Sequence, residues 1–145
     1  MIRENKQLLL IDLCARLPYG VKVRISSEGN GHLHQNTTTL DIDNLHLYML
    51  DGGYYIHGNI YRIPCFQLLP YLRPMSSMTE EEKRAFDKFI CIDEDAWHGK
   101  ENGCLNQAKI MSGGIDWLLS HHFDFRGLIE KGLALEAPEG MYKTE

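Results

Sequence analysis

The sequence lacks long hydrophobic runs and strong positive charge. Its longest purely aliphatic stretch is Leu8–Ile11, whereas a membrane helix needs about 20 apolar residues. No basic segment followed by an apolar stretch and a cleavage site opens the chain, so we expect a cytoplasmic protein without a membrane segment. The formal net charge is -5, and no basic run exceeds two residues. Because sequence-independent binding to nucleic acid needs Lys and Arg that displace counterions, we do not expect a general nucleic-acid binder.

Closely paired cysteines are also absent. Cys14, Cys65, Cys91 and Cys104 are widely spaced and form no CxxC motif. A chain of this length can fold without disulfide bridges, so we expect reduced thiols. Three of the cysteines have apolar neighbours (LCA, PCF and ICI). Such neighbours favour a place in the core for Cys14, Cys65 and Cys91.

The signature motifs of several enzyme classes are missing. The chain has no HExxH zinc motif, no GxGxxG and no phosphate-binding GxxxxGKS/T. Ser112 precedes two glycines but lacks the upstream glycine of a nucleophile elbow. The acidic run Asp93–Asp95 starts like a calcium loop, yet His98 stands where that loop requires glycine. These absences favour a non-enzymatic protein.

The composition is that of an ordinary globular protein. The chain has 145 residues, of which 43% are hydrophobic and 24% are charged, and this size suits one domain with one core. We predict an α+β fold in a single domain, with a small antiparallel β-meander or partly open barrel flanked by an N-terminal helix and C-terminal helices. The expected parts are a helix at about 5–17, a β-rich core at about 20–64, a connector with helices at about 65–132, and a short C-terminal strand with a tail.

Hydrophobic periodicity predicts the helix and strands of the first half of the chain. One face of a helix is predicted by the i, i+3, i+4, i+7 spacing of four residues: Leu10, Leu13, Cys14 and Leu17. Pro18 ends this helix, because proline disfavours helical geometry in the residue before it. The stretch GVKVRIS then alternates apolar and polar residues, as a half-buried strand does. Three further strand candidates, TTTLDI, LHLYML and YYIHGNIYRI, are separated by Asp, Asn and Gly turns that favour antiparallel hairpins.

Capping signals predict the helix that follows the middle strands. The stretch PCFQLLPYLRPMSS contains three prolines and is expected to be a connector. Thr79, followed three residues later by Glu82, forms a capping box. A helix is therefore expected to start there, with Phe86 and Phe89 facing inward.

The last part of the chain is predicted to hold two helices and a strand. From Ser112 onward, a helix is predicted by residues at helical spacing: Ile115, Leu118, Leu119 and His122. Asp124 is expected to cap a second short helix, FRGLIEK, that stops at Gly132. The segment LALEA is expected to end the domain as a short strand.

Three stretches carry a resemblance to known proteins: DLCARLPYGVKV (Asp12–Val23), PYLRPMSSMTEEEK (Pro70–Lys83) and IDWLLSHHFDFRGLIEKGLALEAPEGMY (Ile115–Tyr142). In them the chain resembles a family of small uncharacterised proteins of gut anaerobic bacteria and their prophages. The resemblance covers the two ends and the connector, but neither the middle strands nor the acidic loop. It implies a bacterial cytoplasm and a mobile genetic element as the context. Because the family has no assigned activity, the resemblance gives no role to any residue.

The adjacent histidines His121 and His122 interrupt an apolar helical pattern. Neighbouring helix residues point about 100° apart, so the two imidazoles cannot easily bind one metal. We expect structural roles instead. His122 is predicted to complete the apolar stripe, and His121 is predicted to lie beside Trp117 near the helix C-terminus, where an imidazolium is favoured.

A second group of polar residues is compatible with a metal site on the meander. Zinc accepts histidine together with a carboxylate, and a pair of aspartates on one strand face can hold a hard cation. An Asp-Asn turn explains the same aspartates without a metal. The residues of this alternative zinc or other divalent-metal site are His32, His34, His46, His57, Asp41 and Asp43.

Aromatic residues and one arginine are the candidate binding residues. Aromatic side chains and arginine dominate binding hot spots, and strand alternation would expose some of the tyrosines. For Arg126, the structural alternative is an ion pair with Asp124 or a hydrogen bond to a carbonyl of the preceding helix. The candidate binding residues are Tyr48, Tyr54, Tyr55, Tyr61 and Arg126.

The sequence as a whole favours a non-enzymatic protein-interaction module with no cofactor and an unknown protein partner. The alternative is a metal-dependent enzyme that uses the His/Asp cluster. A weaker alternative is a specific nucleic-acid contact through Lys22 and Arg24 on the first strand.

Overall fold

The computed structural model describes residues 2–25, 37–42, 48–50, 53–58, 61–64, 68–90 and 103–143. Within these ranges lie three α-helices, and none of them is long and apolar enough to cross a membrane. The elements in chain order are α1 (Arg3–Arg16), η1 (Leu17–Tyr19), β1 (Val21–Ile25), β2 (Thr37–Leu40), β3 (Tyr48–Leu50), β4 (Gly53–Gly58), β5 (Tyr61–Pro64), β6 (Leu68–Leu72), η3 (Met75–Ser77), α2 (Glu80–Ile90), α4 (Gly103–Ser120) and β7 (Leu135–Glu136).

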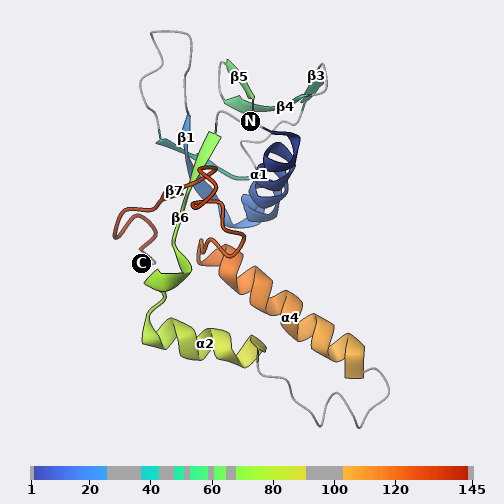
Figure 1. Ribbon diagram of the computed structural model, residues 1–145, viewed down its shortest axis with the longest axis vertical. Helices are drawn as coiled ribbons and strands as arrows, with labels where there is room; N and C mark the ends of the chain where they lie inside the picture. Colours follow the sequence, from blue (N-terminus) through green and yellow to red (C-terminus); the bar gives the residue numbers. More distant parts are fainter. Residues whose placement is uncertain are drawn as a thin grey trace.

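The central sheet is open and mixed, with the strand order β2-β1-β6-β7. β1 pairs antiparallel with β2 and with β6, whereas β6 and β7 run parallel. Val21 and Val23 of β1 are fully buried and Lys22 and Arg24 are half-buried, so the predicted alternation of this strand is confirmed. In Figure 1, this sheet and α1 occupy the middle of the molecule.

A separate three-stranded antiparallel sheet has the order β3-β4-β5. The predicted meander is therefore divided, because β1 and β2 belong to the central sheet and only β3, β4 and β5 follow one another as a meander. The segment expected to be a connector supplies β6, which pairs with β1. Pro70, which cannot donate a backbone hydrogen bond, lies opposite Val23 of β1. It is tolerated because the two-residue strand β7 pairs only with Tyr71 and Leu72 of β6.

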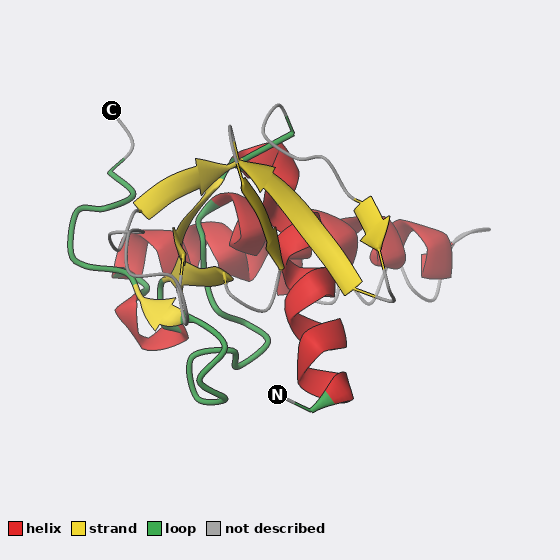
Figure 2. Ribbon diagram, turned by 90° about the horizontal axis from the view of Figure 1, so that it is seen from above, coloured by secondary structure: helices red, strands yellow, loops and turns green. Residues whose placement is uncertain are grey.

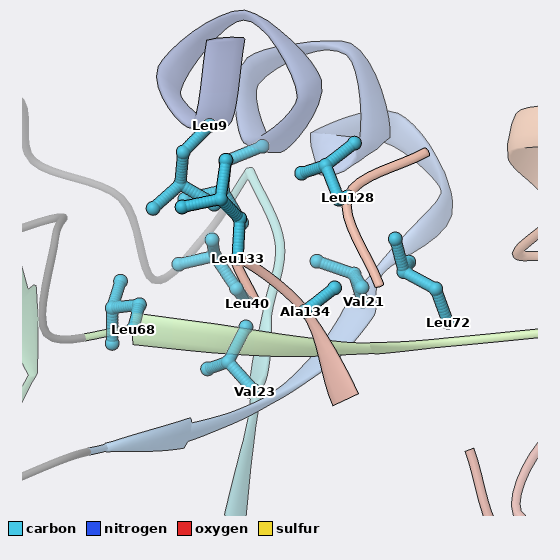
Figure 3. Close-up of a cluster of buried hydrophobic side chains, with 10 residues drawn as sticks. Leu9, Val21, Val23, Leu40, Leu68, Leu72, Leu128, Leu133 and Ala134 are labelled. Atoms are coloured by element: carbon cyan, nitrogen blue, oxygen red, sulfur yellow. The ribbon is translucent and has the colours of Figure 1, made fainter. Parts of the chain in front are cut away.

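The main core lies between α1 and the central sheet. Figure 3 shows Leu9 on α1 above side chains from the strands and from the segment after α4. The buried members of this cluster are Leu9, Leu13, Val21, Val23, Leu40, Leu68, Leu72, Leu128, Leu133 and Ala134. Burial of one large aliphatic side chain contributes about 1.5–3 kcal/mol to folding, so this cluster is the main source of stability for the sheet.

The buried face of α1 differs from the predicted face. Leu9, Asp12, Leu13 and Arg16 are buried at i, i+3, i+4 and i+7 spacing. Cys14, which was placed on the apolar face and in the core, is an exposed free thiol. Leu13 is buried as predicted, but the prediction considered apolar residues only and so left Asp12 and Arg16 out of the buried face.

The segment FRGLIEK forms turns instead of the predicted helix. Gly127 and Gly132 have φ angles of 71° and 69°, in the left-handed region that interrupts a right-handed helix. Asp124 still acts as a cap, since its carboxylate accepts hydrogen bonds from the backbone N–H groups of Leu128 and Ile129, both at 2.9 Å. The segment LALEA contains β7, as predicted.

Helices α2 and α4 lie side by side at the bottom of Figure 1 and run in roughly opposite directions. In Figure 2, which views the molecule from above, these helices lie behind the strands. The predicted capping box at the start of α2 is confirmed: Thr79 N–H donates to Glu82 Oε2 at 2.9 Å, and Glu82 N–H donates to Thr79 Oγ1 at 3.2 Å. α2 contains no buried residue of its own. Phe89 contacts α4 at Gly113 and Gly114, so these glycines make room for α2.

The close approach at Gly114 gives a first prediction. A Cβ atom at position 114 would lie 2.8 Å from Cβ of Phe89, whereas a Cβ at position 113 would lie 3.3 Å from the outer ring atom Cε1. Alanine is favoured over glycine within a helix by about 1 kcal/mol, but overpacking costs about 1–3 kcal/mol. In urea unfolding we expect Gly114→Ala to lower the free energy of unfolding by about 1 kcal/mol.

Gly113→Ala is the matched control for this measurement. Because the phenyl ring edge can shift, we expect Gly113→Ala to be neutral or stabilising. Equal stabilisation by both substitutions would contradict the observed packing of α2 on α4.

Candidate functional site

A buried ion network joins α1 to the segment after α4. Asp12 and Arg16 have fully buried side chains, both 0% exposed. The Asp12 carboxylate accepts hydrogen bonds from Arg16 Nε at 2.7 Å, from Arg16 Nη2 at 3.1 Å and from Arg126 Nη1 at 2.8 Å. Arg16 Nη2 also donates to the carbonyl oxygen of Phe123 at 2.8 Å. The Asp12 carboxylate thus pairs with two guanidinium groups, and the guanidinium of Arg16 also bonds to the backbone of Phe123.

Arg126 therefore has a structural partner that differs from both partners predicted for it. It pairs with Asp12 and lies over the ring of Phe125, with its guanidinium carbon 4.6 Å from the ring centroid. Phe123 is fully buried. The i, i+4 spacing of Asp12 and Arg16 is the sequence signal that could have revealed this network.

The Asp12 network gives a second prediction. Removing one partner of a buried ion pair leaves an uncompensated charge, which costs about 3–5 kcal/mol. We expect Asp12→Asn to lower the free energy of unfolding by about that amount. Arg126→Gln should cost only about 1 kcal/mol, because the Arg126 side chain is 22% exposed and Arg16 keeps its carboxylate.

Urea unfolding monitored by circular dichroism measures these differences, with Asp116→Asn as a control at an exposed aspartate. A loss of stability in Asp12→Asn no larger than that in the control would show that the network does not hold the fold.

The end of α4 is a Schellman motif in which His122 takes the left-handed position usually held by glycine. His122 has a φ of 63°. Its N–H donates to Leu119 O at 3.1 Å, and the N–H of Phe123 donates to Leu118 O at 3.0 Å. The prediction that His122 completes the apolar helix stripe was wrong, because α4 ends at Ser120 and the chain then reverses.

His121 lies where the sequence predicted. Its ring stacks on Trp117 with a centroid separation of 3.9 Å. Nδ1 lies 2.8 Å from Trp117 O. Because a carbonyl oxygen only accepts, Nδ1 carries the hydrogen of this bond. His121 thus has a structural role at the helix end.

The ring of His122 stacks on Tyr142 of the C-terminal segment, with a centroid separation of 3.7 Å. The Tyr142 hydroxyl accepts a hydrogen bond from Lys22 N–H at 2.9 Å and donates to Tyr71 O at 2.7 Å. The register of β1 and β6 brings Lys22 and Tyr71 opposite each other, next to the pair Val23 and Pro70. The hydroxyl therefore bridges the two strands, and burial raises the pKa of Tyr142 to about 12.

His122 is held in its neutral form. Burial, followed by the positive charges of Arg16, His121, Arg73 and Lys22, lowers the pKa of His122 from 6.5 to about 4. Its Nδ1 atom is buried and has no hydrogen-bond partner among the described residues, and the same is true of Arg16 Nη1. Protonation of His122 would add a positive charge near the buried Arg16 and the partly exposed Arg73, so the fold favours the neutral imidazole.

The lowered pKa of His122 gives a third prediction. A histidine whose pKa falls on folding contributes stability that is present above its unfolded pKa and is lost as the pH falls through the folded value. The relevant window is pH 6.5 to about 4. We expect His122→Asn, which tolerates positive φ, to lose less thermal stability across this window than the unsubstituted protein, by a few degrees in Tm.

Ser112→Asn, at an exposed and uncharged residue of α4, is the control for that titration and should keep the pH dependence of the unsubstituted protein. Glu82, whose pKa is lowered from 4.5 to about 2 chiefly by its hydrogen bond to Arg73, loses its contribution at lower pH. Identical Tm profiles for His122→Asn and Ser112→Asn would contradict the account of His122.

A pocket of about 490 Å³ lies beside the C-terminal segment. Its wall includes Arg73, Ser77, Glu136, Tyr142 and Lys143. Several of its polar groups already serve the fold. Arg73 forms a bidentate pair with Glu82 at 2.8 and 2.9 Å, Ser77 Oγ donates to Pro74 O, and the Tyr142 hydroxyl bridges two strands. The remaining charges are of both signs, so the pocket does not define one ligand class.

The most distinctive exposed feature is an apolar strip on α4. Met111 and Ile115, one helical turn apart, are 58% and 45% exposed. The small residues Ala108 and Ser112 are exposed beside them. Because i and i+4 residues lie on the same helix face, these four side chains form one surface. We name it the α4 strip: Ala108, Met111, Ser112 and Ile115.

Other residues of α4 pack against α2 and the core. Gly113 and Gly114 face α2, and Trp117 lies against Phe86 of α2 with ring centroids 5.6 Å apart. Leu118 and Leu119 are buried. Among the described side chains of α4, from 107 to 120, Met111 and Ile115 are the exposed large apolar residues.

The predicted metal site is not tested by the described residues. His32, His34, His46 and Asp43 lie outside them, and only the backbone of His57 is described. In the β4–β5 register, the backbone of His57 lies opposite that of Arg62. Among the described residues no three histidines, cysteines or acidic residues gather in a way that could hold a metal ion.

The four candidate tyrosines are placed by backbone register alone. Tyr48 pairs with Tyr55, while Tyr61 pairs with Gly58. Directly opposed residues share a sheet face and successive residues alternate. Tyr48 and Tyr55 therefore belong to one face of the β3-β4-β5 sheet, and Tyr54 and Tyr61 belong to the other. No single face of this sheet carries all four.

Comparison with known proteins gives no further guide to function. No protein-family model, curated protein or solved structure matches the chain.

Proposed function

We propose that the protein is a non-enzymatic interaction module that binds a protein partner through the α4 strip. The observation that carries this proposal is the exposure of Met111 and Ile115 on a helix that packs against α2 and the core through other residues. Exposed apolar side chains gathered on one face mark interaction sites more often than isolated ones do. Methionine suits such a surface, because its flexible side chain adapts to a partner.

The surroundings of the strip also favour a protein partner. Its border carries one charge of each sign, Lys109 and Asp116, both exposed. An apolar centre with a polar rim is the usual anatomy of a protein interface. A bacterial cytoplasm and a prophage context, as the sequence resemblance implies, remain part of this proposal. The tyrosines of the β3-β4-β5 sheet remain candidates for a second contact surface.

A binding experiment on the α4 strip tests this function and gives a fourth prediction. The purified protein is immobilised and exposed to an extract of the cells that carry its gene, and the retained proteins are quantified by mass spectrometry. We expect the double variant Met111→Gln/Ile115→Gln to retain a specific partner at least about tenfold less, because loss of apolar contacts at an interface centre costs more than about 1 kcal/mol each.

Ile11→Gln is the matched control, since Ile11 is also an isoleucine on a helix and is 56% exposed. This variant should retain the partner as the unsubstituted protein does. Equal retention by the α4 variant, with an unchanged circular dichroism spectrum, would remove the α4 strip as the binding surface.

A further inference from the structure

We infer that the α4 strip binds the same strip on a second copy of this chain, with the two α4 helices antiparallel around a two-fold axis. This inference rests on the proposed function of the strip as an interaction surface. A two-fold interface must be self-complementary, since each patch meets an identical patch. The apolar residues of the α4 strip and the two charged residues on its border, Lys109 and Asp116, are spaced in a way that meets this requirement.

The apolar positions are symmetric about position 113. Met111 and Ile115 lie two residues to either side of it. When two antiparallel helices cross there, Met111 lies opposite the partner's Ile115, and Ile115 opposite the partner's Met111. Both large apolar side chains of each copy are then covered at once. Ala108 and Ser112 are small enough to let the helix backbones approach closely.

The charges on the border have the same symmetry. Lys109 and Asp116 are seven residues apart, which is almost two full turns, so they lie on the same flank of α4. In an antiparallel two-fold helix pair, each flank of one helix lies beside the same flank of its partner. In a parallel pair, each flank lies beside the opposite flank of the partner. With the same crossing point, Lys109 lies within about one residue rise, roughly 1.5 Å, of the level of the partner's Asp116. Each copy contributes one cation and one anion, so two opposite-charge pairs form.

The charged residues of α4 between 103 and 120 are Lys109 and Asp116 alone, and the arrangement pairs both of them. A parallel pairing would leave both charges on an outer flank away from the partner. The antiparallel two-fold arrangement is therefore the one that α4 itself favours.

Sedimentation equilibrium of the purified protein tests this inference and gives the fifth prediction. We expect a reversible monomer–dimer equilibrium that Met111→Gln/Ile115→Gln abolishes and the control Ile11→Gln leaves unchanged. We expect each single charge reversal, Lys109→Glu or Asp116→Lys, to weaken dimerisation about fivefold, because it puts like charges opposite each other at two exposed places.

The combined variant Lys109→Glu/Asp116→Lys restores opposite charges across the two-fold axis, and we expect it to regain the dimerisation of the unsubstituted protein. A different protein partner would not change its charges in step, so this rescue is specific to self-association. Circular dichroism confirms that each variant is folded.

A chain that stays monomeric at every concentration would overturn the inference, as would a dimer that survives the α4 substitutions or a charge swap without rescue. If the chain is monomeric but still retains another protein through the α4 strip, the inference fails and the proposed function stands. If it dimerises as described but retains no other protein, the inference stands and the wider role in binding a different partner fails.

Discussion

The fold depends on one buried carboxylate. Asp12 receives hydrogen bonds from Arg16 on its own helix and from Arg126 beyond α4, while Arg16 also reaches the carbonyl of Phe123. These contacts join α1 to a segment more than 100 residues away, as the separation of 114 between Asp12 and Arg126 shows. Charge-assisted hydrogen bonds depend closely on geometry, so the network fixes the place where the chain leaves α4.

The structures around the network follow from that fixed point. His122 takes a left-handed conformation and ends α4, and its ring then stacks on Tyr142. Tyr142 in turn bridges β1 and β6 through its hydroxyl. The end of α4 is thereby attached to the sheet, while the rest of the helix extends with α2 as its neighbour (Figure 1). One side of α4 is left exposed, and this exposure underlies the proposed interaction.

Sequence patterns predicted the elements that follow simple local rules. The alternation of β1, the capping box of Thr79 and Glu82, and the position of His121 beside Trp117 are confirmed. Each of these depends on residues close together in the chain. The α+β class and the helix at the N-terminus also follow from local periodicity.

The features that sequence patterns missed depend on contacts between distant segments. Burial of Asp12 and Arg16 requires Arg126 and the Phe123 carbonyl, so the helix face of α1 was assigned wrongly. β6 forms around Pro70 because β1 supplies its neighbour. Ser112, Gly113 and Gly114 were considered as a failed catalytic motif, whereas the glycines accommodate Phe89. The α4 strip was missed because Ile115 was expected to face the core and is 45% exposed.

Nuclear magnetic resonance of the arginine side chains tests the role of the buried network most directly. A guanidinium held by a carboxylate and a carbonyl, away from water, exchanges its hydrogens slowly and rotates slowly. We predict separate, slowly exchanging Nη signals and a protected Nε–H for Arg16 at neutral pH, in contrast to averaged signals for the exposed Arg84. If Arg16 gave averaged, rapidly exchanging signals like those of Arg84, the buried network could not be what fixes this fold.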